Sequence, residues 1–199
     1  MKFFFSLLAF FVCMPLQVMA GAAELPGQAP VRLRSVQADF VQEKQLKILT
    51  HPIISTGTFA FQAPQSLRWE YRKPVPSLLL MHGGKVKKYV ERDGHMVEDT
   101  RMQLDAMQMV LSEISNWLDG RFTDNTMFTV SFPQKQTILL TPKDQGMAAM
   151  ISSIELKLAD QKGLLDEVTI FEGPGSLTRL TFKNRRLNQE LPASLFTGR

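Results

Sequence analysis

The sequence predicts a mainly β fold with some helix, an α+β protein built on an antiparallel sheet that is curled or closed to protect its edges. Three observations predict it. Apolar residues alternate with polar ones through about ten short segments, and turn residues separate these segments. One long segment instead repeats its apolar residues at helical spacing.

The alternating segments begin near residue 36 and continue to residue 182. The clearest is "SLRWEYRKP" at 66–74, where Leu67, Trp69 and Tyr71 occupy alternate positions with charged residues between them. A strand with this pattern buries one face and exposes the other. The remaining predicted strands are 36–40, 57–61, 77–81, 86–90, 128–132, 138–140, 154–158, 168–170 and 180–182.

Short turn sequences rich in Gly, Pro and Asp separate these strands. They are "QAPQ", "RKPVP", "HGG", "RDG", "TPKDQG", "DQKG" and "GPG". The last is followed by Ser176 in "GPGSL", which superficially resembles a nucleophile elbow. It lacks the second glycine of that motif and lies between two predicted strands, so a hairpin turn is the better interpretation.

One segment, residues 100–120, has the period of a helix. Its apolar residues fall within an arc of about 120° at 100° per residue, with polar residues on the opposite side. Thr100 and Gln103 have the spacing of a capping box, and Gly120 provides a C-terminal stop. Because no second helix of this kind is predicted, we expect the helix to lie across the concave face of the sheet.

Residues 1–20 have the layout of a secretory signal peptide. Lys2 supplies the positive start, and the apolar stretch at 3–16 is too short to span a bilayer as a helix. Val18 and Ala20 form the small pair before a cleavage site, although cleavage after Ala23 fits nearly as well. We therefore predict export, followed by a single domain over residues 21–199.

Charge and cysteine content narrow the function classes further. The net charge is +4, and loss of Lys2 with the leader leaves +3. The only cysteine, Cys13, lies in the leader, which excludes disulfides, thiolate metal sites and cysteine catalysis from the exported protein. Two basic clusters, "KVKK" at 85–88 and "KNRR" at 183–186, are either solvated surface or contacts for an anionic membrane or acidic partner.

We find no constellation typical of catalysis. His51, His82 and His95 lack the spacing of metal ligands, and the scattered acidic residues fit a solvated role better than acid–base catalysis. The sequence also lacks a phosphate loop and a dinucleotide fingerprint. We therefore expect no enzyme, no cofactor, no metal site and no nucleic-acid partner.

Methionine is frequent, with 11 in the chain. Its unbranched, polarisable side chain suits a surface that repacks around changing contents, although filling an ordinary core is the alternative interpretation. Met102 and Met109 lie towards the polar side of the predicted helix, where a closed core could not use them.

The segment "FAFQAPQSLRWEYRKPVPSLLLMHGGKVKKYV" at 59–90 resembles the signature region of LolA-like periplasmic outer-membrane lipoprotein carriers. It contains an aromatic strand, a proline, a Trp on the next strand, a second proline, a glycine turn and a strand ending in Tyr. Three further stretches agree in order, "SVQADFVQEK", "TILLTPK" and "GSLTRLTFKNRRLNQELPASLF". The resemblance covers nearly the whole chain after the leader.

This resemblance implies an unclosed antiparallel β-barrel, or strongly curved sheet, with a helical lid over a hydrophobic cavity. The lid would be the helix at 100–120. The residues expected to line or support the cavity are Phe40, Phe59, Phe61, Leu67, Trp69 and Tyr71 from the sheet and Met107, Val110, Leu111 and Ile114 from the lid.

The resemblance also implies a function. Such carriers shield the acyl chains of a lipoprotein or related lipid, take it from an inner-membrane exporter complex and pass it to an outer-membrane acceptor. We accordingly expect a periplasmic monomer with lipoprotein or lipid cargo. The alternatives are a specialised carrier of another acylated or polyene lipid, and a sensor or chaperone domain that binds lipid or peptide and signals to a membrane partner.

The sequence departs from the family pattern in three places. Ala63 precedes Pro64 where the family has an arginine that ties down the lid. An N-terminal helix looks short or absent because of Pro26 and Pro30, and the chain ends soon after Phe196. These departures concern the lid and the cargo more than the sheet.

Overall fold

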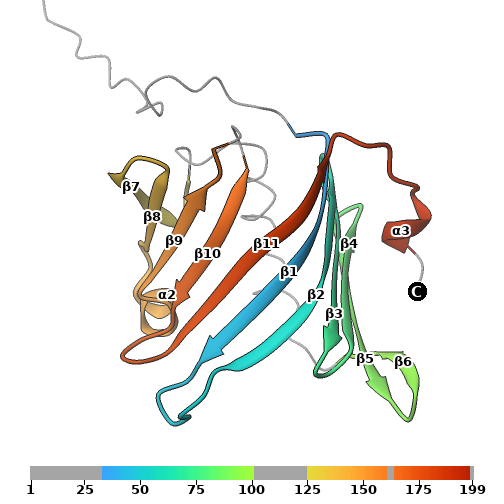
Figure 1. Cartoon of the computed structure of the whole chain (residues 1–199), viewed down its shortest axis with the longest axis horizontal. Helices are drawn as coiled ribbons and strands as arrows, with labels where there is room; N and C mark the ends of the chain where they lie inside the picture. The colour runs from blue at the N-terminus through green and yellow to red at the C-terminus, as the bar shows by residue number, and fades with distance from the viewer. Residues whose placement is uncertain (1–32, 101–124, 161–163, 198–199) are drawn as a thin grey trace, which may run out of the picture.

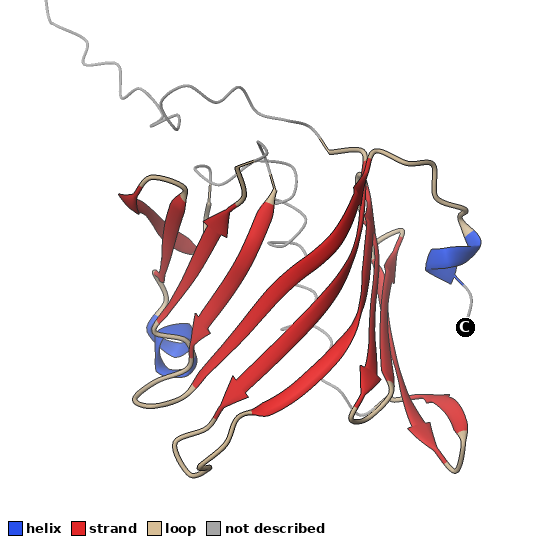
Figure 2. Ribbon diagram, viewed as in Figure 1, coloured by secondary structure: helices blue, strands red, loops and turns tan. Residues whose placement is uncertain are grey.

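The computed structural model describes residues 33–100, 125–160 and 164–197. The predicted leader, the opening segment and the predicted helix at 100–120 lie almost entirely outside these residues. The described residues form one 11-stranded antiparallel sheet (Figures 1 and 2). Its strands are β1 (Ser35–Gln45), β2 (Ile53–Gln62), β3 (Ser66–Lys73), β4 (Ser77–His82), β5 (Lys85–Arg92), β6 (His95–Glu98), β7 (Phe128–Gln134), β8 (Thr137–Pro142), β9 (Ser153–Leu158), β10 (Leu165–Phe171) and β11 (Leu177–Leu187).

The strand order is β6-β5-β4-β3-β2-β1-β11-β10-β9-β8-β7, so β1 pairs with β11 in the middle of the sheet. The sheet curls strongly, and its edge strands β6 and β7 do not pair with each other (Figure 1). This confirms the prediction of an unclosed, strongly curved antiparallel sheet. The helical lid stays a prediction, because its residues lie outside the described ranges.

Two local elements differ from expectation. The short strand β6 follows the predicted "RDG" turn but has only four residues, too few for an alternation to be recognised. The stretch "TPKDQG" leads into a short helix, α2 (Gln145–Met150), rather than a simple turn. Asp144 caps this helix, with its carboxylate accepting a hydrogen bond of 2.9 Å from the backbone N–H of Met147.

The predicted hairpin at "GPG" is confirmed, since it joins β10 to β11. Gly173 and Gly175 have φ angles of 103° and 76°, which are accessible to glycine at little cost. Ser176 therefore lies in a turn between two strands. Its hydroxyl accepts a hydrogen bond of 3.2 Å from the backbone N–H of Lys47.

A second short helix, α3 (Ser194–Thr197), packs on the outer face of the sheet (Figure 1). Phe196 is buried there against Ala60 and Leu191. A guanidinium nitrogen of Arg68 donates to the carbonyl of Leu195 at 3.3 Å. Because side chains alternate along a strand, the neighbours of Ala60, Phe59 and Phe61, point to the opposite, inner face.

The two faces differ in chemistry. On the outer face, opposite charges lie next to each other across strands β9 and β10, for example Lys157 and Glu167 at 2.9 Å. The hydrogen bond that Lys157 donates to the Glu167 carboxylate raises the pKa of the Lys157 ammonium. Exposed pairs of this kind contribute little to stability, but they keep the outer face hydrated.

The helices of the described residues were also compared with the length and apolar character that a membrane span requires, and none of them meets both.

Gly57 of β2 is required by close packing. It lies directly opposite Phe40 of β1, and the ring of Phe40 lies over it. A Cβ atom at position 57 would come within 1.9 Å of the carbonyl oxygen of Glu70 and 2.7 Å of the Phe40 ring. Any side chain there must displace the backbone of β3 as well as the ring.

We therefore expect Gly57→Ala to destabilise the fold by about 3 kcal/mol, because overpacking against backbone cannot relax by a rotamer change. Urea unfolding of both proteins measures this difference. Gly146→Ala is the control, since its nearest contact is the side chain of Asp144 at 3.0 Å. Its stability should change by less than about 1 kcal/mol. Equal stabilities for Gly57→Ala and the wild type would contradict the packing at this position.

Candidate binding site on the inner face

The inner face carries one continuous apolar cluster that spans the sheet from β5 to β7. The alternation of side chains explains it, since every second residue of a strand points to this side and most of these residues are apolar. Strand β4 lacks a polar side because it is buried on both faces, with Met81 in the inner cluster and Leu78 and Leu80 in an outer one.

The structure brings the predicted sheet residues together in this cluster. Five of them are buried, namely Phe40, Phe59, Phe61, Leu67 and Trp69. Tyr71 is half-buried and packs against the same cluster. The predicted lid residues Met107, Val110, Leu111 and Ile114 lie outside the described residues, so their place opposite the sheet stays a prediction.

Aromatic rings form the centre of the cluster. Trp69 lies 5.2 Å from Phe40 and 5.3 Å from Phe59, measured between ring centroids. Phe40 also meets Tyr71 edge to face at 5.1 Å. Edge-to-face and tilted contacts of this kind are favourable for aromatic pairs. The rings therefore present a mixture of faces and edges rather than one flat stack.

Phe182 is a fifth ring of this cluster, and the candidate residues taken from the sequence do not include it. It lies 5.9 Å from Phe59 and 6.5 Å from Trp69. It pairs with Phe40 across β1 and β11. The alternation of Leu180 and Phe182 indicates an apolar strand face, but only the pairing of β11 with β1 places that face beside the aromatic strands.

Two polar groups lie among these rings. The hydroxyl of Tyr71 donates to the side-chain carbonyl of Gln42 at 2.7 Å. The indole N–H of Trp69 is buried and has no hydrogen-bond partner among the described residues. A buried donor without an acceptor is costly, so it is rare in folded proteins. Burial also raises the pKa of the Tyr71 phenol to about 12, since the charged form would lose its hydration.

Titratable residues on the described part of the chain do not form a metal site, since no group of three or more His, Cys, Asp or Glu residues comes together there. The three histidines belong to separate elements. His82 ends β4, where its ring nitrogen shares a hydrogen bond of 2.8 Å with Ser66. His51 is in the β1–β2 loop, and His95 begins β6.

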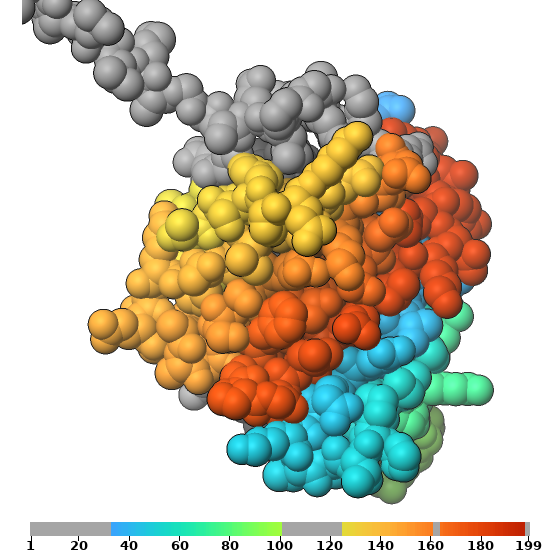
Figure 3. All heavy atoms as spheres, turned by 60° about the vertical axis from the view of Figure 1, so that its left-hand side comes forward, coloured from blue at the N-terminus to red at the C-terminus, as the bar shows by residue number. Residues whose placement is uncertain are grey.

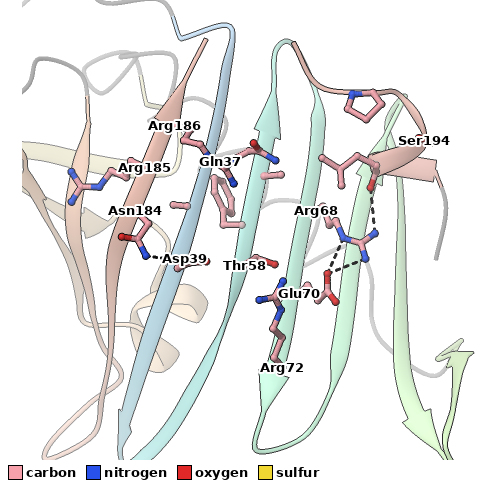
Figure 4. Close-up of a pocket in the computed structure, with 15 residues that line it drawn as sticks. Gln37, Asp39, Thr58, Arg68, Glu70, Arg72, Asn184, Arg185, Arg186 and Ser194 are labelled. Carbon is pink, nitrogen blue, oxygen red and sulfur yellow. Dashed lines mark hydrogen bonds and ion pairs between the residues drawn. The ribbon is translucent and has the colours of Figure 1, made fainter. Parts of the chain in front are cut away.

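A groove of about 900 Å³ lies on the outer face, beneath the C-terminal segment (Figure 4). Charged side chains from β1, β3 and β11 line it, including Asp39, Arg68 and Glu70. Arg68 pairs with Glu70 at 2.9 Å, and Asn184 donates to Asp39 at 2.7 Å. This groove combines charged groups with apolar ones such as Ala60 and Leu195, so it differs in kind from the hydrophobic cavity predicted on the inner face.

The family model for the outer membrane lipoprotein carrier protein LolA matches residues 32–199. The chain belongs to the LolA family. The LolA-family outer-membrane lipoprotein carrier protein of Dechloromonas aromatica is 25% identical over 196 residues, covering 94% of this chain and 87% of the relative. That of Bordetella avium is 25% identical over 194 residues, covering 96% and 90%.

Among solved structures, a LolA superfamily protein from Nitrosomonas europaea is similar, with a TM-score of 0.42, 10% identity and coverage of 85% of this chain and 92% of that one. Similarity at this level adds nothing to the assignment. LolA-family carriers are periplasmic lipoprotein chaperones and not enzymes, so membership agrees with the expectation that this protein is not an enzyme. A general carrier role for the chain follows from its relatives.

The environment of Tyr71 can be measured, because the chain has only two tyrosines. In the Tyr89→Phe variant, the ultraviolet absorbance of the phenolate reports Tyr71 alone. We expect a midpoint near pH 12 in the folded protein, against the ordinary value of 10.0. Since the unfolded chain loses this proton first, folding stability should fall as the pH rises from 10 towards 12. A folded-state midpoint near 10 would place the phenol in water.

Proposed function

We propose that the inner face of this LolA-family protein binds the acyl chains of a lipoprotein or related lipid and shields them from water in the periplasm. The protein would take this cargo from an inner-membrane exporter complex and deliver it to an outer-membrane acceptor. The observation that carries the proposal is the aromatic cluster on the concave side of an unclosed sheet, in which Phe40, Phe59 and Trp69 are buried and Tyr71 and Phe182 are partly buried.

The physical need for a carrier is clear from the energy of exposing lipid to water. Each methylene group costs about 0.8 kcal/mol to expose, so a chain of about sixteen carbons cannot cross an aqueous gap unaided at a useful rate. An apolar surface that curls around the chain removes most of this cost. A closed core would have no room for it.

The aromatic cluster suits reversible binding. Its rings meet at angles between 29° and 82°, so a guest chain would contact edges as well as faces. Handover requires the carrier to hold the chain about as well as the donor and less well than the acceptor. Loose contacts with aromatic and methionine side chains serve this purpose better than tight complementary packing.

The indole N–H of Trp69 supports an acyl ester as the bound group. This donor is buried beside Tyr71, whose hydroxyl donates to Gln42 and whose oxygen makes only a weak contact with the indole N–H. The carbonyl oxygen of an ester would accept a hydrogen bond from the indole while its hydrocarbon chain packs on the neighbouring rings. Trp69 would then fix the polar end of the lipid, and the phenylalanines would contact its chain.

We further propose the organisation that the sequence predicts. Residues 1–20 would be a signal peptide, and 21–199 would form a single monomeric carrier domain. The segment at 100–120 would cover the cargo from the side opposite the sheet, with Met107, Val110, Leu111 and Ile114 facing it. These four residues have the helical spacing needed to form one apolar stripe.

One observation favours a specialised cargo as the second candidate function. Ala63 stands where the family pattern has an arginine, and the structure packs Ala63 against the inner apolar cluster. Its backbone N–H donates to the carbonyl of Arg34 at 2.9 Å. Position 63 therefore adds apolar surface instead of a positive charge, which suits another acylated or polyene lipid.

A brominated fatty acid tests acyl binding at Trp69 directly, because bromine quenches indole fluorescence only at contact distance. The chain has two tryptophans, so Trp117→Phe leaves Trp69 as the single reporter. We expect saturable quenching by bromopalmitate and none by palmitate. The Trp69→Gln variant should bind a fluorescent fatty acid about tenfold more weakly than the wild type, since the substitution removes a large apolar contact.

A reporter on the outer face supplies the matched control. In a variant combining Trp69→Phe, Trp117→Phe and Leu195→Trp, the indole would lie by the outer groove. Bromopalmitate should leave its fluorescence unchanged. Quenching at position 195 with none at Trp69 would show that the lipid binds to the wrong face for this proposal.

A further inference from the structure

The large hydrophobic side chains that are exposed on the described residues gather at one end of the sheet. Ile48 is 87% exposed, Met150 66% and Val75 65%. The full set is Ile48, Leu49, Ile53, Ile54, Val75 and Met150, which we call the apolar rim. Large exposed apolar groups are ordinary when they are scattered, but a collection at one end indicates an interaction surface.

The antiparallel topology explains why these residues share an end. The β1–β2 loop, the β3–β4 loop and the α2 connection between β8 and β9 all lie at the same end of the strands (Figure 1). The turns at the opposite end include 63–65, 83–84 and 135–136. Among the described residues, those opposite turns carry no large exposed apolar side chain.

The tip of the β1–β2 hairpin dominates the apolar rim. Every residue from 47 to 54 is exposed. Strand β2 extends past the end of its neighbour β3, because the pairing of these two strands ends at Thr56 and Lys73. Ile53 and Ile54 therefore pair with β1 on one side and extend past β3 on the other, and the hairpin lies at the lower end of the molecule (Figure 3).

On its other side the hairpin is held in place. The ammonium of Lys44 pairs with Glu172 at 2.9 Å, and the backbone N–H of Lys47 donates to Ser176 at 3.2 Å. These contacts fix the loop against the β10–β11 turn. The aliphatic tip is thus presented on an anchored support, which lowers the entropy cost of binding.

Positive charge accompanies the apolar side chains. The stretch from Lys44 to Ser55 contains two lysines and a histidine but no acidic residue. Lys73 is exposed next to Val75 in the β3–β4 loop. Three acids lie near the rim, and each has a partner. Glu43, opposite Ile54, pairs with Arg179 at 3.7 Å, Glu172 pairs with Lys44, and Asp144 caps α2. Aliphatic side chains next to lysines are typical of surfaces that bind anionic bilayers.

We propose that the apolar rim docks on the interface of a phospholipid bilayer that contains anionic lipid, with Ile48 and Leu49 inserted among the head groups. The shape of the rim favours a bilayer over a protein partner. Its members are separate projecting tips instead of a groove, and they are aliphatic, whereas aromatic residues and arginine dominate protein hot spots. The inference goes beyond the proposed function, because the protein would contact the membrane itself.

Flotation with lipid vesicles tests this proposal, using protein purified after export. We expect binding to vesicles of phosphatidylethanolamine mixed with phosphatidylglycerol. The double variant Ile48→Ser, Leu49→Ser should lower the partition coefficient at least about tenfold, since it removes two aliphatic groups from the inserted tip. Because both side chains are exposed, its unfolding midpoint should match that of the wild type.

Charge variants provide a matched pair. Lys47→Gln should weaken binding to the anionic vesicles about fivefold and leave binding to phosphatidylcholine vesicles unchanged. Lys135→Gln removes an exposed lysine from the opposite end of the sheet and should have no effect. Vesicle binding that survives the Ile48 and Leu49 double variant would overturn the proposal. So would dimerisation through these residues, detected by sedimentation, in place of vesicle binding.

Acyl binding is measured on the same variants. In the Ile48 and Leu49 double variant, bromopalmitate should quench the fluorescence of Trp69 as strongly as it does in the wild type. If this variant loses vesicle binding but keeps acyl binding, the result supports bilayer docking by the apolar rim as a property separate from acyl binding. If acyl binding is absent while vesicle binding is intact, the result would count against the carrier function but would not affect the proposal that the apolar rim docks on a bilayer.

Discussion

The pairing of β1 with β11 is the interaction on which the structure depends. It joins residues about 140 positions apart, as Phe40 and Phe182 show, and without it the sheet would fall into two separate halves. Closing so long a loop costs entropy, which grows only slowly with loop length. An irregularity in the pairing between Gln37 and Asp39 is supported by Asn184, which has a φ of 52° and donates to Asp39. The pairing of β1 with β11, together with the contact between Asn184 and Asp39, brings the aromatic rings of both halves into one cluster.

The contrast between the two faces follows from that single continuous sheet. Alternation places an apolar cluster on the concave side and charged pairs such as Lys157 and Glu167 on the convex side. Among the described residues, the concave side combines large rings with a buried donor at Trp69 that makes no regular hydrogen bond. The groove on the convex side instead contains charged groups that pair with each other, such as Arg68 and Glu70. The chemistry of a carrier therefore concentrates on one surface, while the other surface keeps the protein soluble.

Much of this arrangement can be predicted from the sequence, because its period of two is explicit around Phe40, Phe59 and Trp69. Alternation assigns a residue to a face but does not say which strands are neighbours. Phe182 illustrates the difference, since its place among the rings depends on a distant partner. The short elements β6 and α2 could not be predicted from a repeat of apolar residues, because four or six residues are too few to show one. The exposure of Ile53 and Ile54 is related to the extension of β2 past β3, which the local pattern does not report.

The free edges at β6 and β7 have a consequence for the range of guests. A closed barrel has a circumference fixed by its strand number and stagger, so it can widen only by breaking a ladder. An open sheet spreads its curvature over many strand pairs, each of which can untwist slightly with its hydrogen bonds intact. An open sheet is thus able to accommodate guests of different width, so under the proposed function a ligand with three hydrocarbon chains would not require a different protein from a ligand with one.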